Sequence, residues 1–201
     1  FAANQNYACT VLTSVLADGE RYGRIVRNRD GMVEKIVEAK DCSAEELAIK
    51  EINTGIFCFK TSKLFDGLKE ITTNNAQNEY YLTDLVEIFH KHNEKVNAMI
   101  VDDAEETMGV NDRVDLAKAN SWMKKHINHK HMLNGVTILD PDNTYIDADV
   151  EIGEDTTIYP NVHLQGNTKI GSHVTILPNS FLRNALIEDG VTIDSSKIVE
   201  S

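Results

Sequence analysis

The chain has 201 residues, enough for about two domains, and carries 32 acidic against 20 basic side chains, a formal net charge of −12. This negative charge disfavours nucleic acid or an anionic membrane as the main partner, although a local site can still bind a small anion. No apolar run approaches the roughly 20 residues of a membrane span, and no signal peptide is visible. Cys9, Cys42 and Cys58 are widely spaced, so we expect reduced structural thiols in a cytoplasmic protein.

The region before about Asn134 alternates strand-like and helix-like patterns, which indicates an α/β layer arrangement. A strand rich in Val, Leu and Thr is expected over residues 8–16, and the loop 17–21 follows it. Residues 22–27 and 32–38 flank an Asn-Arg-Asp-Gly turn, so we expect a hairpin there.

Two short helices and a further strand are expected next. Ser43 and Glu46 have the spacing of a capping box, which predicts a helix start. Residues 52–59 are almost continuously apolar, as in a buried strand of a mixed sheet, and Thr61 is expected to cap the helix after that strand. The apolar face predicted for that helix carries Leu64, Phe65, Leu68 and Ile71.

A third helix is predicted over residues 80–92, a strand over 95–101, and a long helical segment over 111–133 that joins the α/β part to the last part of the chain. The residues that the third helix is expected to bury are Leu82, Leu85, Val86 and Phe89. The apolar residues of the long segment are Val114, Leu116, Ala117, Trp122, Met123 and Ile127.

The last part of the chain is a hexapeptide repeat. Such a period predicts a left-handed parallel β-helix, in which three six-residue pieces close one triangular coil and the aliphatic residues stack inside. The aliphatic positions are Ile146, Ile152, Ile158, Leu164, Ile170, Ile176 and Leu182, and after a slip of one residue Ile187, Ile193 and Val199. A small or β-branched residue follows four places after each of the first six, at Val150, Thr156, Val162, Thr168, Val174 and Ser180.

Prisms of this kind commonly assemble side by side around a threefold axis, so a homotrimer is expected. The chain begins at Phe1 without a Met, and Ser201 directly follows a strand-like stretch that has no polar cap. We therefore expect the sequence to be an internal fragment of a longer protein.

Asn53 and Gly55 interrupt the apolar strand at residues 52–59. A buried Asn must satisfy its amide and a Gly adds no packing, so both weaken a strand. A ligand that forms a hydrogen bond with Asn53 would explain why an Asn occupies this position in the strand. Alternatively, Asn53 satisfies a neighbouring loop and Gly55 permits a bulge, which the residues alone favour.

Two further features can carry chemistry. Gly23 at the mouth of the hairpin lets a ligand approach the backbone, and Glu38 offers two acceptors suited to adjacent sugar hydroxyls, although a lone Glu is more often a solvated carboxylate. Asn111 follows Gly109 at the start of the long helix. It can cap that helix, or its amide oxygen can be a ligand for Mg²⁺ together with phosphates.

The histidines are weaker candidates. His126, His129 and His131 lie in one basic stretch, but His126 and His131 do not share a helix face, so a solvated turn is favoured over a zinc site. His163 and His173 lie on the prism, where acyl transfer often uses a histidine, yet neither has a neighbouring motif that marks it as a base.

Five motifs, in this order and followed by hexapeptides, closely resemble the bacterial bifunctional N-acetylglucosamine-1-phosphate uridyltransferase/glucosamine-1-phosphate acetyltransferase family. They are YGRIVR at 22–27, VEAKD at 37–41, EINTG at 51–55, NNAQNEYYLTD at 74–84 and GVNDR at 109–113. Each motif is modest alone, but the five together form a specific signature that covers essentially the whole chain.

The resemblance implies three parts. These are the C-terminal part of a Rossmann-like uridyltransferase domain over residues 1–110, a linker helix over 111–134, and the start of a trimeric left-handed β-helix with the acetyltransferase over 135–201. The implied enzyme uses Mg²⁺ to transfer uridyl from UTP to N-acetylglucosamine 1-phosphate and, in the full protein, transfers acetyl from acetyl-CoA to glucosamine 1-phosphate. Its product, UDP-N-acetylglucosamine, supplies peptidoglycan and lipopolysaccharide of the cell envelope.

By the same resemblance, Gly23 matches the family's backbone contact to the sugar, and Glu38 and Asn53 match its sugar-binding side chains. Asn111 matches its second Mg²⁺ ligand, which also lies near the nucleotide sugar. The family's Gly-rich nucleotide loop and first metal-binding Asp would precede Phe1, and its acetyltransferase His and coenzyme A contacts would come after Ser201. No catalytic residue is therefore expected in this stretch, and the fragment alone is expected to be inactive.

Two other interpretations stay open. One is another sugar-1-phosphate nucleotidyltransferase with a β-helix tail, such as an enzyme that makes ADP-glucose or a dTDP-sugar. The other is a non-catalytic trimerisation scaffold.

Overall fold

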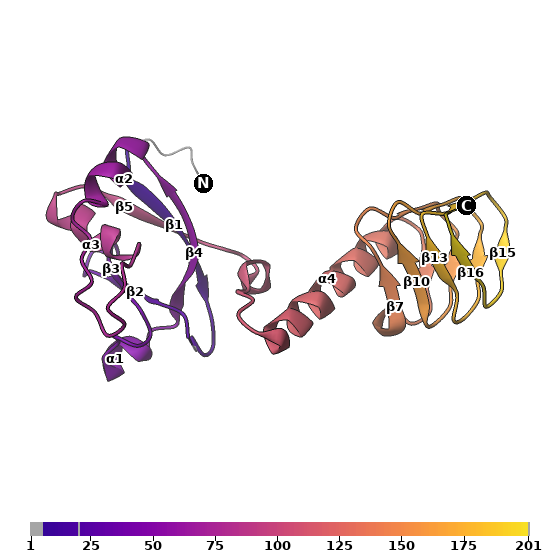
Figure 1. Cartoon of the computed structure of the whole chain (residues 1–201), viewed down its shortest axis with the longest axis horizontal. Helices are drawn as coiled ribbons and strands as arrows, with labels where there is room; N and C mark the ends of the chain where they lie inside the picture. Colours follow the sequence, from indigo (N-terminus) through magenta and orange to yellow (C-terminus); the bar gives the residue numbers. More distant parts are fainter. Residues whose placement is uncertain (1–5, 20, 201) are drawn as a thin grey trace. The chain divides into compact units, whose positions relative to one another are not determined.

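The computed structural model describes residues 6–19 and 21–200, and the chain divides into two compact units, Phe1–Gly109 and Val110–Ser201 (Figure 1). The expectations that concern Phe1, Glu20 and Ser201 fall outside the described residues.

A five-stranded mixed sheet forms the first unit, with the order β3-β2-β4-β1-β5 (Figure 1). Strands β1 and β5 pair in parallel, whereas the β1–β4, β2–β3 and β2–β4 pairs are antiparallel. The predicted strands and the mixed sheet are thereby confirmed. Their bounds are β1 Cys9–Val15, β2 Arg24–Arg27, β3 Val33–Val37, β4 Glu51–Phe59 and β5 Val96–Ile100.

The predicted hairpin is formed by β2 and β3. Asn28 begins its turn, and the side-chain Oδ1 of Asn28 accepts hydrogen bonds from the backbone N–H groups of Asp30 and Met32, each at 3.0 Å. Gly31 has a φ of +79°, a left-handed conformation that costs Gly little. The local turn chemistry therefore explains why this pair of strands is readable from the sequence.

Strand β4 contains a bulge. Val11 pairs with Phe57 and Thr13 with Asn53, so residues 54–56 lie opposite a single residue of β1, and Gly55 has a φ of +81°. The interpretation of Gly55 as a bulge residue is confirmed. The prediction of a buried strand holds in part. Ile52 and Asn53 are buried, Gly55 and Ile56 in the bulge are exposed, and Phe57 and Phe59 are half-buried against the core.

The first two helices differ from each other in how they start. Helix α1, Ala44–Leu47, has the predicted capping box between Ser43 and Glu46. Helix α2, Thr61–Gly67, begins after Lys60, which is extended and makes no side-chain cap. The prediction that Thr61 caps α2 is wrong, because Thr61 is already the first helical residue. The predicted apolar face is also wrong in part, since Phe65 is 61% exposed and Ile71 lies beyond the end of the helix.

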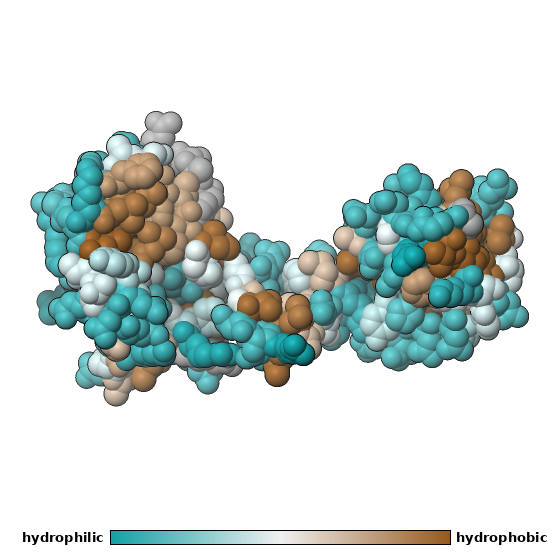
Figure 2. Space-filling view, viewed as in Figure 1, coloured by the Kyte–Doolittle hydropathy of each residue, from teal (hydrophilic) through white to brown (hydrophobic). Residues whose placement is uncertain are grey.

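Helix α3, Asp84–Lys91, packs against β3 and β5 with the predicted residues Leu85, Val86 and Phe89, together with Ile88. Leu82 is 43% exposed because it precedes the helix, so its predicted burial is wrong. The unit still leaves apolar surface uncovered, and Figure 2 shows an apolar area over the region of α2 and β5. The main core cluster of this unit consists of Ala8, Cys9, Val11, Ile25, Val33, Ile36, Leu85, Val86, Ile88, Phe89 and Val96, and Ile52 is buried as well.

A short 3₁₀ turn, η1 Ala104–Thr107, ends the first unit, and the second begins with the long helix α4, Arg113–Leu133. The apolar residues predicted to matter on α4 are largely exposed, including Val114, Leu116 and Met123. The buried residues are instead Asn128 and His131. The reason is that the end of α4 packs on β6, β7 and η2, where Asn128 Nδ2 donates to the carbonyl oxygens of Pro141 and Thr144.

The remainder of the second unit is a three-faced parallel β-helix, which fits the predicted left-handed form (Figure 1). Its sheets have the orders β16-β13-β10-β7, β14-β11-β8 and β15-β12-β9-β6. In-register pairing stacks Ile146, Leu164 and Leu182 in one column. The elements are β6 Thr137–Ile138, η2 Pro141–Asn143, β7 Thr144–Ile146, β8 Glu151–Ile152, β9 Thr157–Ile158, β10 Val162–Gln165, β11 Lys169–Ile170, β12 Thr175–Ile176, β13 Phe181–Arg183, β14 Leu186–Ile187, β15 Thr192–Ile193 and β16 Lys197–Val199.

The small residues predicted at the corners are buried and satisfied. Thr156 Oγ1 donates to Gly171 O at 2.9 Å and accepts from Val174 N at 3.1 Å, and Ser180 Oγ donates to Leu177 O at 2.8 Å. The chain turns through left-handed residues, which Asn and Asp tolerate better than other side chains. Such residues include Asp155, Asn161, Asn179 and Asn184, with φ between 50° and 63°.

One predicted inward position at the end of the repeat is wrong. Ile198, not Val199, packs on the core, because Leu182 pairs with Ile198 while Val199 pairs with Arg183. The spacing therefore slips a second time after Ile193.

Candidate functional site

Gly23 and Glu38 meet at the open end of the hairpin. Gly23 is buried and directly precedes β2, and Glu38 directly follows β3. A Cβ atom placed on Gly23 would lie 3.4 Å from Glu38 Oε2, 3.5 Å from Glu38 Oε1 and 3.3 Å from Ile36 Cγ2. The carboxylate of Glu38 therefore lies directly beside the backbone of Gly23.

Asn53 joins this pair from the neighbouring strand. The backbone N–H of Asn53 donates to Gly23 O at 2.8 Å, and Asn53 is only 8% exposed. Its Oδ1 accepts a hydrogen bond from Gly55 N at 3.0 Å, a local bond of the kind that a purely structural role for Asn53 requires. An amide oxygen has two lone pairs, so this bond leaves acceptor capacity. The structure thus brings together three of the four predicted site residues, Gly23, Glu38 and Asn53.

Thr83 belongs to the same cluster, although the sequence alone assigns it no role. Its Oγ1 donates to Glu38 Oε1 at 2.9 Å, and Thr83 is 6% exposed. The sequence signal for Thr83 is its place in the motif at residues 74–84. That motif contributes to the family resemblance but assigns no role to Thr83.

The segment 75–83, which we call the strap, is tied to the turn that follows β3. Asp41 is the anchor, because Asp41 Oδ1 accepts from Ala76 N at 2.7 Å and Asp41 Oδ2 accepts from Tyr81 Oη at 3.3 Å. Gln77 Nε2 donates to Tyr81 Oη at 2.7 Å, and Lys40 Nζ donates to Gln77 Oε1. The strap therefore forms one wall beside Glu38.

Negative charge dominates this wall. Burial, and then the carboxylates of Glu87, Asp41 and Glu38, raise the pKa of Asp84 above its ordinary value. Burial also raises the pKa of Tyr81. Such surroundings suit the hydroxyl donors of a sugar better than they suit a phosphate.

The end of the first unit is attached beside Gly23. The N–H of Gly109 donates to Tyr22 Oη at 2.8 Å across 87 residues of sequence. The GVNDR motif therefore begins next to the YGRIVR motif, a proximity that the order of the motifs along the chain does not reveal.

Asn111 lies in the second unit, two residues before the start of α4. It is exposed, and it does not cap α4. Asp112 is the cap, because Asp112 Oδ1 accepts from the N–H groups of Val114 and Asp115 at 2.9 Å each. The capping interpretation of Asn111 is wrong. Its amide oxygen is one donor of the kind Mg²⁺ takes, and the described part of the chain holds no cluster of three or more His, Cys, Asp or Glu that could hold a metal.

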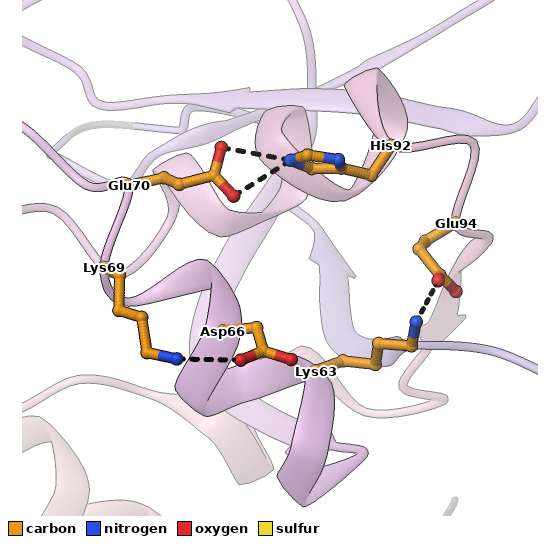
Figure 3. A network of polar contacts seen from close by, with 6 residues as sticks. All are labelled: Lys63, Asp66, Lys69, Glu70, His92 and Glu94. Atoms are coloured by element: carbon orange, nitrogen blue, oxygen red, sulfur yellow. Dashed lines mark hydrogen bonds and ion pairs between the residues drawn. The ribbon is translucent and has the colours of Figure 1, made fainter.

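A cavity of about 270 Å³ lies elsewhere, between α2 and the end of α3 (Figure 3). Figure 3 shows that polar side chains in and beside this cavity point toward one another, and they form ion pairs or, for His92 and Glu70, a hydrogen bond. Phe89 and Ile88 are among the residues that line it. We do not assign it as the site, because its polar side chains are bonded to one another. The pairs are Lys69–Asp66 at 2.9 Å, His92–Glu70 at 2.9 Å and Lys63–Glu94.

The histidines and cysteines show no nucleophile–base pair in the residues that the structure describes. His131 is buried, so the prediction of a wholly solvated basic turn is wrong there, and burial followed by Lys130 lowers its pKa. His163 stacks on Tyr145 with ring centres 4.5 Å apart, and the exposed His173 lies 3.8 Å from Asp155. Cys9, Cys42 and Cys58 are free thiols, and burial raises the pKa of Cys9 to about 12.

None of the helices built from the described residues is both long enough and apolar enough to cross a membrane.

Comparison with known proteins adds to this geometry. Residues 149–184 match the family model described as bacterial transferase hexapeptide (six repeats). A protein of Clostridium botulinum (strain 657 / Type Ba4), named bifunctional protein GlmU, is 50% identical over 201 residues, which is 100% of this chain and 44% of that protein. GlmU is the name of the bifunctional family that the five motifs resemble. The predicted resemblance is confirmed.

Two other GlmU proteins agree. That of Acetivibrio thermocellus is 52% identical over 98% of this chain and 43% of its own length. That of Limosilactobacillus reuteri is 52% identical over 96% of this chain and 43% of its own length. The chain thus spans less than half the length of the GlmU proteins that it matches.

Proposed function

We propose that this chain is part of a bifunctional enzyme of UDP-N-acetylglucosamine synthesis. In this proposal residues 1–110 belong to a Rossmann-like uridyltransferase domain, 111–134 form a linker helix, and 135–201 begin the acetyltransferase β-helix. Similarity along the whole chain to GlmU proteins supports the proposal.

The single observation that carries the proposal is the meeting of Gly23, Glu38 and Asn53. A carboxylate beside a bare glycine backbone can accept hydrogen bonds from adjacent sugar hydroxyls while the ring approaches the main chain. Asn53 contributes a largely buried amide whose backbone is bonded to Gly23. These residues would bind the N-acetylglucosamine part of the substrate or product.

In the proposed reaction the phosphate of N-acetylglucosamine 1-phosphate attacks the α-phosphorus of UTP, and pyrophosphate leaves. The role of this part of the chain is positioning: Glu38 and Asn53 hold the sugar so that its phosphate is presented to the nucleotide. Mg²⁺, when bound, would neutralise phosphate charge, and Asn111 would offer it one amide oxygen beside ligands from elsewhere. In the whole protein the β-helix would serve acetyl transfer from acetyl-CoA to glucosamine 1-phosphate, in a cytoplasmic homotrimer.

A substrate panel with the full-length protein tests this function. UTP, ATP and dTTP are compared as donors, with N-acetylglucosamine 1-phosphate and glucose 1-phosphate as acceptors, and pyrophosphate release is measured. We expect release mainly from UTP with N-acetylglucosamine 1-phosphate. Preference for ATP or dTTP would favour another sugar-1-phosphate nucleotidyltransferase. If no pair of substrates releases pyrophosphate, the interpretation as a non-catalytic trimerisation scaffold is favoured.

A further inference from the structure

Thr83 occupies the N-cap position of α3 without capping it. Thr at this position usually accepts a hydrogen bond from an N–H of the first helical turn. Thr83 makes no such side-chain bond, and its hydroxyl donates instead to Glu38 Oε1 at 2.9 Å. The hydroxyl therefore serves Glu38 rather than its own helix.

This bond fixes the direction of the Glu38 carboxylate. Glu38 is half-buried at the end of β3, and a Glu side chain has several rotatable bonds whose freedom is lost when it is held. Thr83 engages Oε1, and both carboxylate oxygens lie at nearly the same distance, 3.4 and 3.5 Å, from the position a Gly23 Cβ would take. One oxygen is thus held by Thr83, and the carboxylate as a whole lies beside the glycine backbone.

Thr83 is itself held firmly. The strap before it is tied to Asp41 through Ala76 N and Tyr81 Oη, and directly after it Leu85 and Val86 are fully buried. A hydroxyl fixed on both sides can hold a neighbouring carboxylate with little added entropy cost.

We propose that Thr83 is a positioning residue of the sugar site, which orients Glu38 so that Oε2 accepts a hydrogen bond from a sugar hydroxyl. The inference rests on the proposed function, since it names a residue that acts through Glu38 on the same ligand. It predicts that the hydroxyl of Thr83, and not its methyl group, determines sugar affinity.

The test measures the affinity of the full-length protein for UDP-N-acetylglucosamine by calorimetry. Thr83→Val keeps the shape of the side chain and removes the hydroxyl, and we expect binding to weaken on the order of tenfold. Thr83→Ser keeps the hydroxyl and should stay within about threefold of the wild type. Thr168→Val is the matched control, because it removes a buried, bonded threonine hydroxyl from the β-helix, and it should leave this affinity unchanged.

A double-mutant comparison shows whether Thr83 acts through Glu38. In a Glu38→Ala background, Thr83→Val should weaken binding little further. Wild-type affinity in Thr83→Val, equal losses in Thr83→Ser, or a full additional loss in the Glu38→Ala background would each overturn the inference while the proposed function stands. Failure of the wild-type protein to bind UDP-N-acetylglucosamine would overturn the proposed function, and the inference with it.

Discussion

At the scale of single residues, Glu38 and Asn53 both lie beside Gly23 but come from different strands and are held in different ways. Glu38 comes from the end of the hairpin and is held by Thr83, whereas Asn53 comes from the next strand and is held by its own backbone bond to Gly23. Neither residue depends on the other for its position. The two residues can therefore be substituted independently of each other.

Glu38→Ala and Asn53→Ala should raise the apparent KM for N-acetylglucosamine 1-phosphate more than that for UTP in the full-length protein. Each lost hydrogen bond should cost about 1–3 kcal/mol, with the larger loss where a partner group stays buried and unpaired. Steady-state kinetics with each substrate varied in turn measure the difference. Equal damage to both KM values would indicate misfolding or a wrong assignment of these residues.

Asn111 and Asp112 are adjacent in the sequence but have different roles at the start of α4. Asp112 caps α4, and the exposed side chain of Asn111 does not. In the full-length protein we expect Asn111→Ala to lower uridyl transfer at limiting Mg²⁺ by roughly tenfold or more, with partial recovery at higher Mg²⁺ and near-normal acetyl transfer.

Asp112→Ala is the control for that prediction. It should lower thermal stability through loss of the cap, by about 1 kcal/mol, whereas Asn111→Ala should not. Uridyl transfer unchanged by Asn111→Ala at limiting Mg²⁺ would remove Asn111 from the metal site.

At the scale of elements, α4 shows how a polar helix can dock on an apolar column. Asn128 and His131 are the buried residues of α4, and Ile127 packs against the β-helix core. The side chain of Asn128 donates hydrogen bonds to the backbone carbonyl oxygens of Pro141 and Thr144 in the first coil. Without Asn128, these oxygens would be buried at the contact without this donor. The contact therefore includes hydrogen bonds as well as apolar packing.

His131 should make the stability of this unit depend on pH. Burial lowers the folded-state pKa of His131 below the ordinary 6.5, so the unfolded chain binds the proton more tightly. The stabilising contribution is therefore present above about pH 6.5 and is lost as the pH falls below it. Thermal melts between pH 7.5 and 5 measure the effect, and His131→Gln should flatten the profile. A profile of the same steepness in His131→Gln would exclude this residue as its source.

At the scale of the whole molecule, the two units are stabilised differently. In the β-helix each strand pairs with strands one coil away, so contacts repeat at nearly constant spacing. In the first unit the sheet joins strands from distant parts of the chain, as in the pairing of β1 with β5. Local changes should thus act locally in the β-helix and more widely in the sheet.

The 201-residue chain by itself is expected to be a trimer that releases no pyrophosphate from UTP. The assembly rests on the flat faces of a short β-helix, which a threefold arrangement can bury. The lack of activity rests on Asn111, since a single amide oxygen does not hold Mg²⁺ against a triphosphate. Sedimentation at micromolar concentration tests the first part, where a monomer contradicts it. Pyrophosphate release above the blank contradicts the second.

The sequence by itself determined the elements whose causes are local. The period-six column, the Asn28–Gly31 turn and the Ser43–Glu46 capping box depend on residues close in sequence or one coil apart, so pattern and spacing suffice to read them. Gly23, Glu38 and Asn53 stay predictions as ligand contacts. The sequence singles out Asn53 because an Asn is unexpected in a buried strand, and it singles out all three because the surrounding motifs resemble a known family.

The tertiary structure alone decided which residues meet. Glu38 and Thr83 are 45 positions apart, and a Thr just before a helix would be read by local rules as its cap. The same limit explains why the sequence does not reveal Asn128 and His131: their burial depends on the first coil of the β-helix, and helical periodicity alone points to the exposed Val114 and Leu116. Contacts between distant segments decide these cases, because a folded chain satisfies its buried polar groups wherever a partner lies, without regard to sequence distance.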